Sequence, residues 1–265
     1  MNALSYIDIL LNTIDASVCM GIVLVTVPRI RSGKTDSVPL AFFVFAFISV
    51  ALSDMYWMIY HIMRPDTRMP IAANEMGEIA CFLLLSSAIR LVYRNIHVPA
   101  KKEVIGAALF SIAEIVFWII WTGEWMQDIL GGAAFCYMLC VCAWALKQED
   151  CLSSREWRLL GLSCLAIIGF NTAWFYMPEP LKTAAVAIAN ITSIVWIIVF
   201  LIKTTKAFKE DAPVAKLIAL TFALFAWCIS TMYMADGHYY YVGLIFSIVA
   251  KLYMDMAVKR EVTET

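Results

Sequence analysis

The chain has 265 residues, of which 62% are hydrophobic and only 15% are charged, and its formal net charge is −1. A soluble domain is nearer to half apolar and a quarter charged, so this composition excludes a water-soluble globular core. The near-zero net charge gives no indication of nucleic acid as a partner. Because helices satisfy their backbone polar groups internally in lipid, we predict an all-α, polytopic integral membrane helix bundle. It is expected to form a single transmembrane domain over residues 1–265.

Nine apolar segments approach the roughly 20 residues that a helix needs to cross a bilayer. Prolines and glycines in the short connections between many of them mark turns. The segments cover residues 5–28, 38–62, 71–93, 103–122, 128–146, 157–177, 182–203, 213–234 and 239–258. The sequence therefore predicts about nine transmembrane helices.

Lysine and arginine residues gather in alternate connections. Fifteen of the 20 lie on one side of the predicted membrane: Arg29, Arg31, Lys34, Arg94, Lys101, Lys102, Lys147, Arg155, Arg158, Lys203, Lys206, Lys209, Lys216, Lys259 and Arg260. By the positive-inside rule this asymmetry places the N-terminus outside and the C-terminus in the cytoplasm. We expect a multi-pass protein of the cytoplasmic (plasma) membrane, the inner membrane of the cell.

The first predicted span carries polar side chains on one helix face. Asp8, Asn12 and Asp15 are spaced at i, i+4 and i+7, and Cys19 continues the stripe. Such a stripe is expected to face other helices or a water-filled cavity. In the simpler alternative, Asp8 lies at the outer interface and Asn12 forms a hydrogen bond with a neighbouring group.

The second span places Asp54, Trp57 and His61 on one side of a helix, in its outer half. A carboxylate at membrane depth costs about 2.5–3.5 kcal/mol on insertion scales, so Asp54 indicates either a site or a hydrogen bond to another helix. His61 has two interpretations: an interfacial histidine at a helix end, or a member of the same site.

The third span begins with Asn74, Glu75 and Glu78, which share helix faces at i+3 and i+4 spacing. Two neighbouring carboxylates repel each other, so a proton or a cation is expected between them. Glu75 also suits the positive end of the helix dipole, which is the simpler explanation for that residue. Gly77 permits the close approach of another helix.

Later spans contain isolated polar residues. Glu114 lies near the middle of the fourth span and is ionisable, which makes a structural role harder to accept. Asn171 and Asn190 are expected to form hydrogen bonds between helices. Lys251 and Asp255, spaced at i and i+4, are expected to form an ion pair near the inner surface.

Consecutive helices joined by short connections are usually neighbours, so the acidic residues of spans one to four are expected to converge. The predicted ligand-binding residues are Asp15, Asp54, Trp57, His61, Asn74, Glu75, Glu78 and Glu114. An acidic pocket that opens outward and is rimmed by aromatic rings suits a metal ion, a proton or an organic amine. No catalytic residues and no cofactor are predicted.

The main functional hypothesis is transport of a small cationic or proton-coupled solute. One alternative is a ligand-sensing or partner-binding membrane module without its own output domain. Another is an intramembrane lipid hydrolase, although the sequence lacks HExxH and GxSxG motifs. The expected partners are the lipid bilayer, the solute or proton, and a membrane-protein partner or a second copy of the chain.

Overall fold

The structure, a computed structural model, describes residues 3–31, 37–64, 73–93, 101–122, 125–234 and 238–264. Within these ranges the chain forms nine α-helices and no strand. The helices are α1 (Ala3–Arg31), α2 (Ser37–Met63), α3 (Ala73–Val92), α4 (Lys101–Thr122), α5 (Trp125–Gln148), α6 (Ser154–Trp174), α7 (Leu181–Lys209), α8 (Val214–Met234) and α9 (His238–Glu264). The predicted all-helical bundle is confirmed.

Six helices in the described part of the chain are long and apolar enough to cross a membrane: α1, α2, α5, α7, α8 and α9. The charged residues of α3 and α6 lower their apolar character; α3, for example, carries Glu75, Glu78 and Arg90 within 20 residues. The structure thus supports a membrane-spanning helical protein. The number of spans and the orientation stay predictions.

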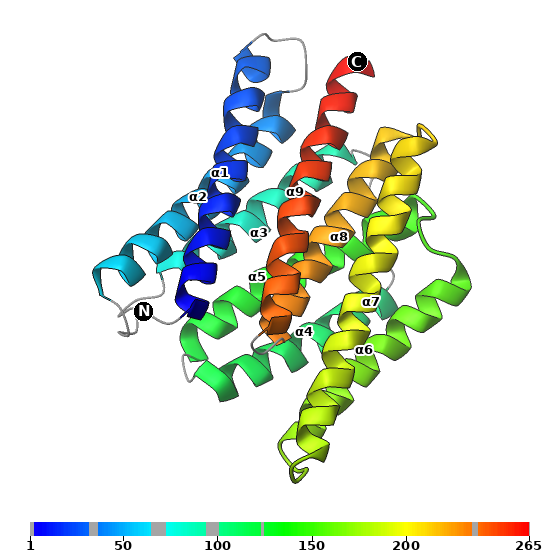
Figure 1. The fold of residues 1–265 in the computed structure, drawn as a ribbon. Coiled ribbons are helices and arrows are strands. Elements are labelled where there is room, and N and C mark those ends of the chain that lie inside the picture. The colour runs from blue at the N-terminus through cyan, green and yellow to red at the C-terminus, as the bar shows by residue number, and fades with distance from the viewer. Residues whose placement is uncertain are drawn as a thin grey trace.

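The helices pack into two groups that share α5 and α8. In the first, α1 contacts α2 and α9, α2 contacts α3, α3 contacts α5, and α9 contacts α8. We call α1, α2, α3 and α9 the cluster half. In the second group α4 contacts α5, α6 and α8, and α7 contacts α6 and α8. We call α4, α6 and α7 the pocket half (Figure 1).

Helix α8 is the centre of the bundle. In its most apolar stretch 89% of the residues are buried, against 56% or less in the other five candidate spans. Its contacts reach α4, α5, α7 and α9, so it touches both halves. Side chains presented by α8 can therefore enter the interior of either half.

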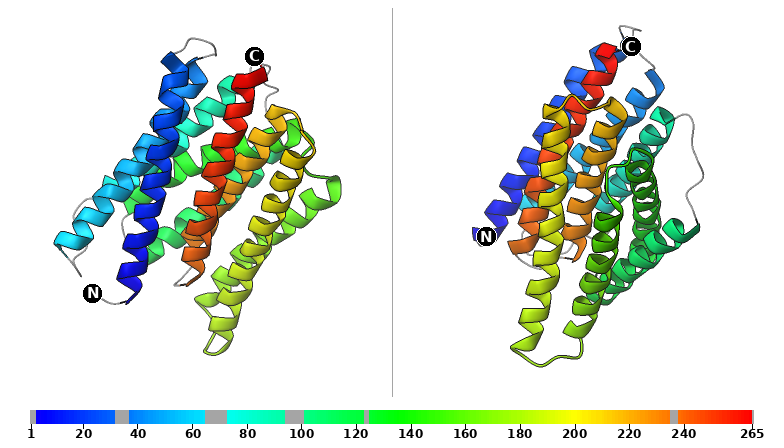
Figure 2. Two further views of the ribbon diagram at one scale, coloured as in Figure 1. Left: turned by 45° about the horizontal axis from the view of Figure 1, so that its top comes forward. Right: turned by 90° about the vertical axis from the view of Figure 1, so that its right-hand side faces the viewer.

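The two chain ends lie at opposite ends of the bundle, although α1 and α9 are in contact (Figures 1 and 2). The odd-numbered helices finish where the even-numbered ones begin, and this is where the fifteen basic residues occur in the sequence. We call this the basic end. By the positive-inside rule it is the predicted cytoplasmic end.

The connection between α5 and α6 shows how the basic end is built. Asp150 adopts a φ of 45°, which aspartate tolerates better than most residues. Ser153 and Glu156 then form a capping box at the start of α6, and Glu156 pairs with Lys203 of α7 at 2.7 Å. Burial alone would raise the pKa of Glu156, but hydrogen bonds from Lys203 and Ser153 lower that pKa to about 2. This carboxylate therefore ties α6 to α7.

Helices α2 and α3 approach each other most closely at Gly77. A Cβ atom at this position would lie 2.7 Å from the carbonyl oxygen of Ser49 and 2.8 Å from Cβ of Ser53. The contact requires the absence of a side chain, as the sequence indicated. It brings the Glu75–Glu78 turn of α3 against the part of α2 that carries Asp54.

Candidate functional site

A buried ion pair joins the first and last helices. Nζ of Lys251 lies 2.6 Å and 2.5 Å from the two carboxylate oxygens of Asp15, and both side chains are nearly inaccessible. The thiol of Cys19 points to the same carboxylate at 3.8 Å. Since an isolated charge is costly to bury, each partner makes the position of the other tolerable.

Two more carboxylates surround this pair. Asp54 on α2 interacts electrostatically with Asp15, Lys251 and Glu78, and Glu78 on α3 interacts with both members of the pair. Oδ2 of Asp54 is buried and accepts no hydrogen bond from the described residues. We call Asp15, Asp54, Glu78 and Lys251 the acidic cluster: three carboxylates share one lysine.

Tyr233, from the outer end of α8, holds Glu78. Its hydroxyl donates to Oε2 of Glu78 at 2.8 Å. The ring of Tyr233 packs edge-on against Phe82 of α3 and Phe135 of α5, with centroid distances of 6.2 Å and 5.5 Å. These contacts restrict the tyrosine rotamer, so the hydroxyl is fixed toward the carboxylate.

The cluster is ordered by depth along the helices. Glu78 is the sixth residue of α3, whereas Asp15 is the thirteenth of α1 and Lys251 the fourteenth of α9. All three helices begin at the end opposite the basic end. Counted from the outer ends of their helices, Asp15 and Lys251 are about two turns further along than Glu78. Asp54 interacts with both levels. The carboxylates thus form a path from the outer end toward the middle.

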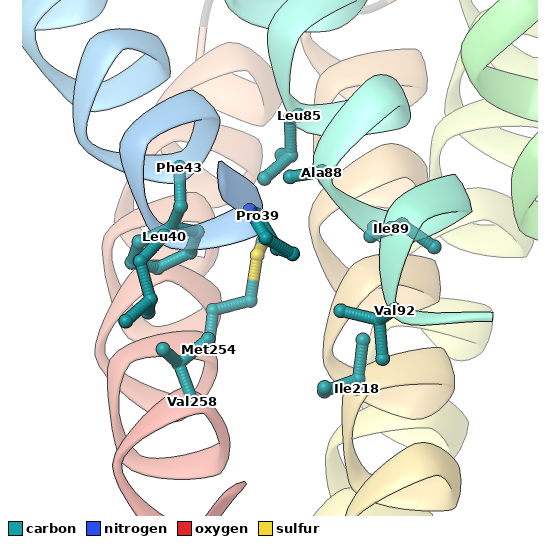
Figure 3. Close-up of a pocket in the computed structure, with 10 residues that line it drawn as sticks. All are labelled: Pro39, Leu40, Phe43, Leu85, Ala88, Ile89, Val92, Ile218, Met254 and Val258. Atoms are coloured by element: carbon teal, nitrogen blue, oxygen red, sulfur yellow. The ribbon is translucent and has the colours of Figure 1, made fainter. Parts of the chain in front are cut away.

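Below the ion pair, toward the basic end, the interior of the cluster half becomes apolar. Side chains of α2, α3, α8 and α9 enclose a cavity of about 30 Å³, room for about one water molecule. Met254 of α9 extends toward Pro39 of α2 across this space, and Leu85 and Ile218 contribute to its walls (Figure 3). We call these four side chains the apolar layer, which separates the acidic cluster from the basic end.

Glu114 does not join the acidic cluster. It lies on α4, nearly inaccessible, and accepts a hydrogen bond from Ser230 of α8 at 2.5 Å. Its second oxygen, Oε2, accepts none from the described residues. Tyr233 lies within electrostatic range of both Glu114 and Glu78. Glu114 therefore belongs to the pocket half, on the other side of α8 from the ion pair.

The pocket half contains the larger cavity. It lies between α4, α5, α6, α7 and α8 and has a volume of about 390 Å³. Phe110, Trp227 and Phe200 contribute aromatic walls, and the indole N–H of Trp227 is already bonded to the carbonyl oxygen of Ser193 at 2.8 Å. The cavity is thus apolar, unlike the interior of the cluster half.

The remaining predicted site residues lie at the outer end. The rings of Trp57 and His61 pack together with centroids 4.0 Å apart, and Nδ1 of His61 is buried without a hydrogen bond to the described residues. Glu75 interacts electrostatically with Tyr233. Asn74 is part of α3, but its side chain lies outside the described residues.

The ion-pair partner predicted for Lys251 from the sequence was wrong. Lys251 pairs with Asp15 and not with Asp255, which pairs instead with Lys259 one turn further along α9. Helical spacing suggested the local pair, but depth decides the outcome, because Asp15 and Lys251 lie equally far from the starts of two adjacent helices. Tyr233 was not among the predicted site residues. Its position at the outer end of α8 was the feature that could have indicated a role in the site.

The amides of Asn171 and Asn190 each form a hydrogen bond within their own helix. Their side-chain nitrogens donate to Ile167 and Val186, one turn back in the same helix, at 3.0 Å in each case. Asn12 does the same with the carbonyl oxygen of Asp8 at 2.8 Å, which matches the simpler alternative for that residue. Such bonds to a carbonyl oxygen one turn back satisfy a side-chain donor within a single helix.

Metal ligation finds no support in the described side chains, among which no three His, Cys, Asp or Glu residues are grouped so as to hold a metal ion. All eight cysteines are free thiols. No family model matches this chain, and comparison with curated proteins and with solved structures gives no match either.

Proposed function

We propose that this protein carries a proton, alone or together with a small cationic solute, through the acidic cluster and across the membrane. The observation that supports this proposal is that the buried ion pair of Asp15 and Lys251 lies within electrostatic range of two half-buried carboxylates, Asp54 and Glu78, in an apolar bundle. Ionisable side chains at membrane depth are costly and typically mark ion or proton pathways.

Charge balance explains why a cation is needed. With Asp15, Asp54 and Glu78 all ionised, the cluster would have two more negative charges than Lys251 neutralises. Such an excess is unfavourable in a medium of low polarity. A proton or cation bound at Asp54 and Glu78 relieves this excess of negative charge. The bound proton or cation can be exchanged with the outer end along the path that begins at Glu78.

The apolar layer supports a protein open on its outer side and closed toward the basic end. A cation that reaches Asp54 and Asp15 meets the apolar layer beyond them, which disfavours its passage. Transport then requires α9 or α2 to move, so that Met254 and Pro39 separate. Protonation of Asp15 would weaken its attraction for Lys251 and release α9 from α1.

Proton flux into reconstituted vesicles tests the proposal. Purified protein is placed in vesicles that contain a pH-sensitive dye, and a potassium gradient with valinomycin imposes a membrane potential. We expect the wild-type protein to acidify the lumen faster than protein-free vesicles do, and Asp54→Asn and Glu78→Gln to lower the rate to that background. Asp211→Asn, which changes an exposed carboxylate at the basic end, is the matched control and should retain the flux.

Two results would contradict transport. If Asp54→Asn conducts as well as the wild type, the acidic cluster is not the pathway. If the wild-type protein shows no flux with protons alone or with added organic cations, the sensing alternative gains support instead.

A further inference from the structure

The 390 Å³ cavity of the pocket half opens toward the lipid. Leu109 of α4 and Leu165 of α6 line it, yet they are 62% and 67% exposed. Gly106 and Gly161, also in its walls, face open space: a Cβ atom at either position would meet no other atom within 4 Å. These glycines do not serve helix packing. Their lack of side chains leaves a lateral opening between α4 and α6.

The opening lies near the basic end. Gly106 is the sixth residue of α4 and Gly161 the eighth of α6, and both helices begin at that end. At about 1.5 Å per residue, the two glycines lie within roughly 12 Å of the helix starts. This depth matches the upper part of a lipid acyl chain in the cytoplasmic leaflet of the predicted orientation.

Positive charge flanks the same opening. Lys102 is exposed one turn before Gly106, and Arg158 is exposed three residues before Gly161, so each lies on the face of its helix that carries the glycine. The nearby carboxylate of Glu156 does not cancel Arg158, because it is held by Lys203 at 2.7 Å and by Ser153. The two cations can therefore receive a phosphate.

We propose that this cavity binds one acyl chain of an anionic phospholipid, with the phosphate between Lys102 and Arg158. The volume lies within the range of about 300–1,000 Å³ typical of ligand sites. An apolar cavity of this size stays dry and favours an apolar occupant, and only an anionic headgroup also satisfies the cations at its mouth. The site is independent of the acidic cluster and of the proposed transport.

Native mass spectrometry with defined lipids tests the site. Detergent-purified protein is incubated with phosphatidylglycerol or with phosphatidylcholine of identical chains. We expect one phosphatidylglycerol to be retained in preference to phosphatidylcholine. Lys102→Gln and Arg158→Gln should each reduce that preference by roughly fivefold, the contribution of one basic side chain near an anionic lipid.

Filling the cavity provides the decisive variants. Gly161→Leu inserts a side chain into the space that the acyl chain would occupy, and we expect it to abolish retention. Gly169→Leu is the matched control, because Gly169 lies on the same helix, faces open space and does not line the cavity. Gly106→Leu repeats the test from the opposite wall if Gly161→Leu is poorly folded by size-exclusion chromatography.

Equal retention of phosphatidylglycerol by Gly161→Leu and Gly169→Leu would overturn the proposal, since the lipid would then bind elsewhere. Equal retention of both lipids by the wild-type protein would overturn it as well, because the headgroup contact would be absent.

Discussion

The cluster half and the pocket half differ in what occupies their interiors, although both are built from apolar helices and share α5 and α8. The cluster half encloses three carboxylates and a lysine, closed on one side by the apolar layer. The pocket half encloses an apolar cavity and, apart from it, the buried carboxylate of Glu114, bonded to Ser230. The same bilayer solvent thus allows two kinds of interior, one adapted to a charge and the other to an apolar chain.

The difference follows from how each half provides partners. In the cluster half, close helix contacts such as that at Gly77 bring side chains from four helices within electrostatic range. In the pocket half α4 and α6 also touch, but a Cβ atom at Gly106 or Gly161 would meet no neighbour, so these helices leave a space at the two glycines. Close packing brings Lys251 within electrostatic range of all three carboxylates, whereas the space between α4 and α6 is lined by apolar side chains and suits an apolar group.

The largest effect is expected from Lys251→Met, which leaves three carboxylates without their lysine. Removing one partner of a buried ion pair typically costs about 3–5 kcal/mol, so we expect a loss of that order in the free energy of unfolding. Thermal unfolding in detergent measures it. Lys182→Met removes a half-buried lysine that lies over the ring of Trp174 and has no carboxylate bonded to it in the described residues, and it should have a smaller effect.

A second variant separates charge from packing at the same pair. Asp15→Leu combined with Lys251→Met replaces both ions by apolar side chains and should recover most of the stability lost by Lys251→Met alone. A double variant as unstable as the single one would show that the pair contributes through its shape and not through its charge.

A smaller effect is expected at the contact between α2 and α3. Gly77→Ala places a methyl group against the backbone of Ser49, which cannot yield easily, and should destabilise the protein by about 1–3 kcal/mol. Gly21→Ala is the control: Gly21 faces open space on α1, and alanine should stabilise that helix by about 0.5–1 kcal/mol. Equal unfolding temperatures for both variants would refute the close approach.

The smallest effect concerns Glu156 at the basic end. Because folding lowers its pKa from an ordinary value of 4.5 to about 2, its contribution is fully present above pH 4.5. That contribution is lost as the pH falls from 4.5 through 2. Glu156→Gln should cost about 1 kcal/mol at neutral pH, as for the loss of a helix cap, and should flatten the stability profile between pH 4.5 and 2. Unfolding curves measured at stepwise lower pH test this prediction. If stability falls with pH as steeply in Glu156→Gln as in the wild-type protein, the prediction is wrong.

Much of the fold was predictable from apolar segment length. The segment 213–234 became α8 (Val214–Met234) almost without change. In contrast, α7 continues past the predicted end at residue 203 to Lys209, because a helix does not have to end at the membrane surface when its last turn is lysine-rich.

The site was predictable only in part. The convergence of helices one to three around Asp15, Asp54 and Glu78 follows from their short connections. Glu114 was assigned to the same group because it lies at a similar depth. Depth in the membrane does not determine which side of the bundle a side chain faces, and α4 packs on the far side of α8. Lys251 was assigned a local partner because helical spacing is visible in one segment, whereas contact between α1 and α9 is not.

The most direct test compares one carboxylate from each half in the same vesicle assay. Asp54→Asn and Glu114→Gln each neutralise a buried carboxylate, one within the acidic cluster and the other beside the apolar cavity. We expect Asp54→Asn to lower proton flux to that of protein-free vesicles, whereas Glu114→Gln should keep the wild-type rate. Loss of flux in Glu114→Gln with normal flux in Asp54→Asn would contradict it and would move the pathway to the pocket half.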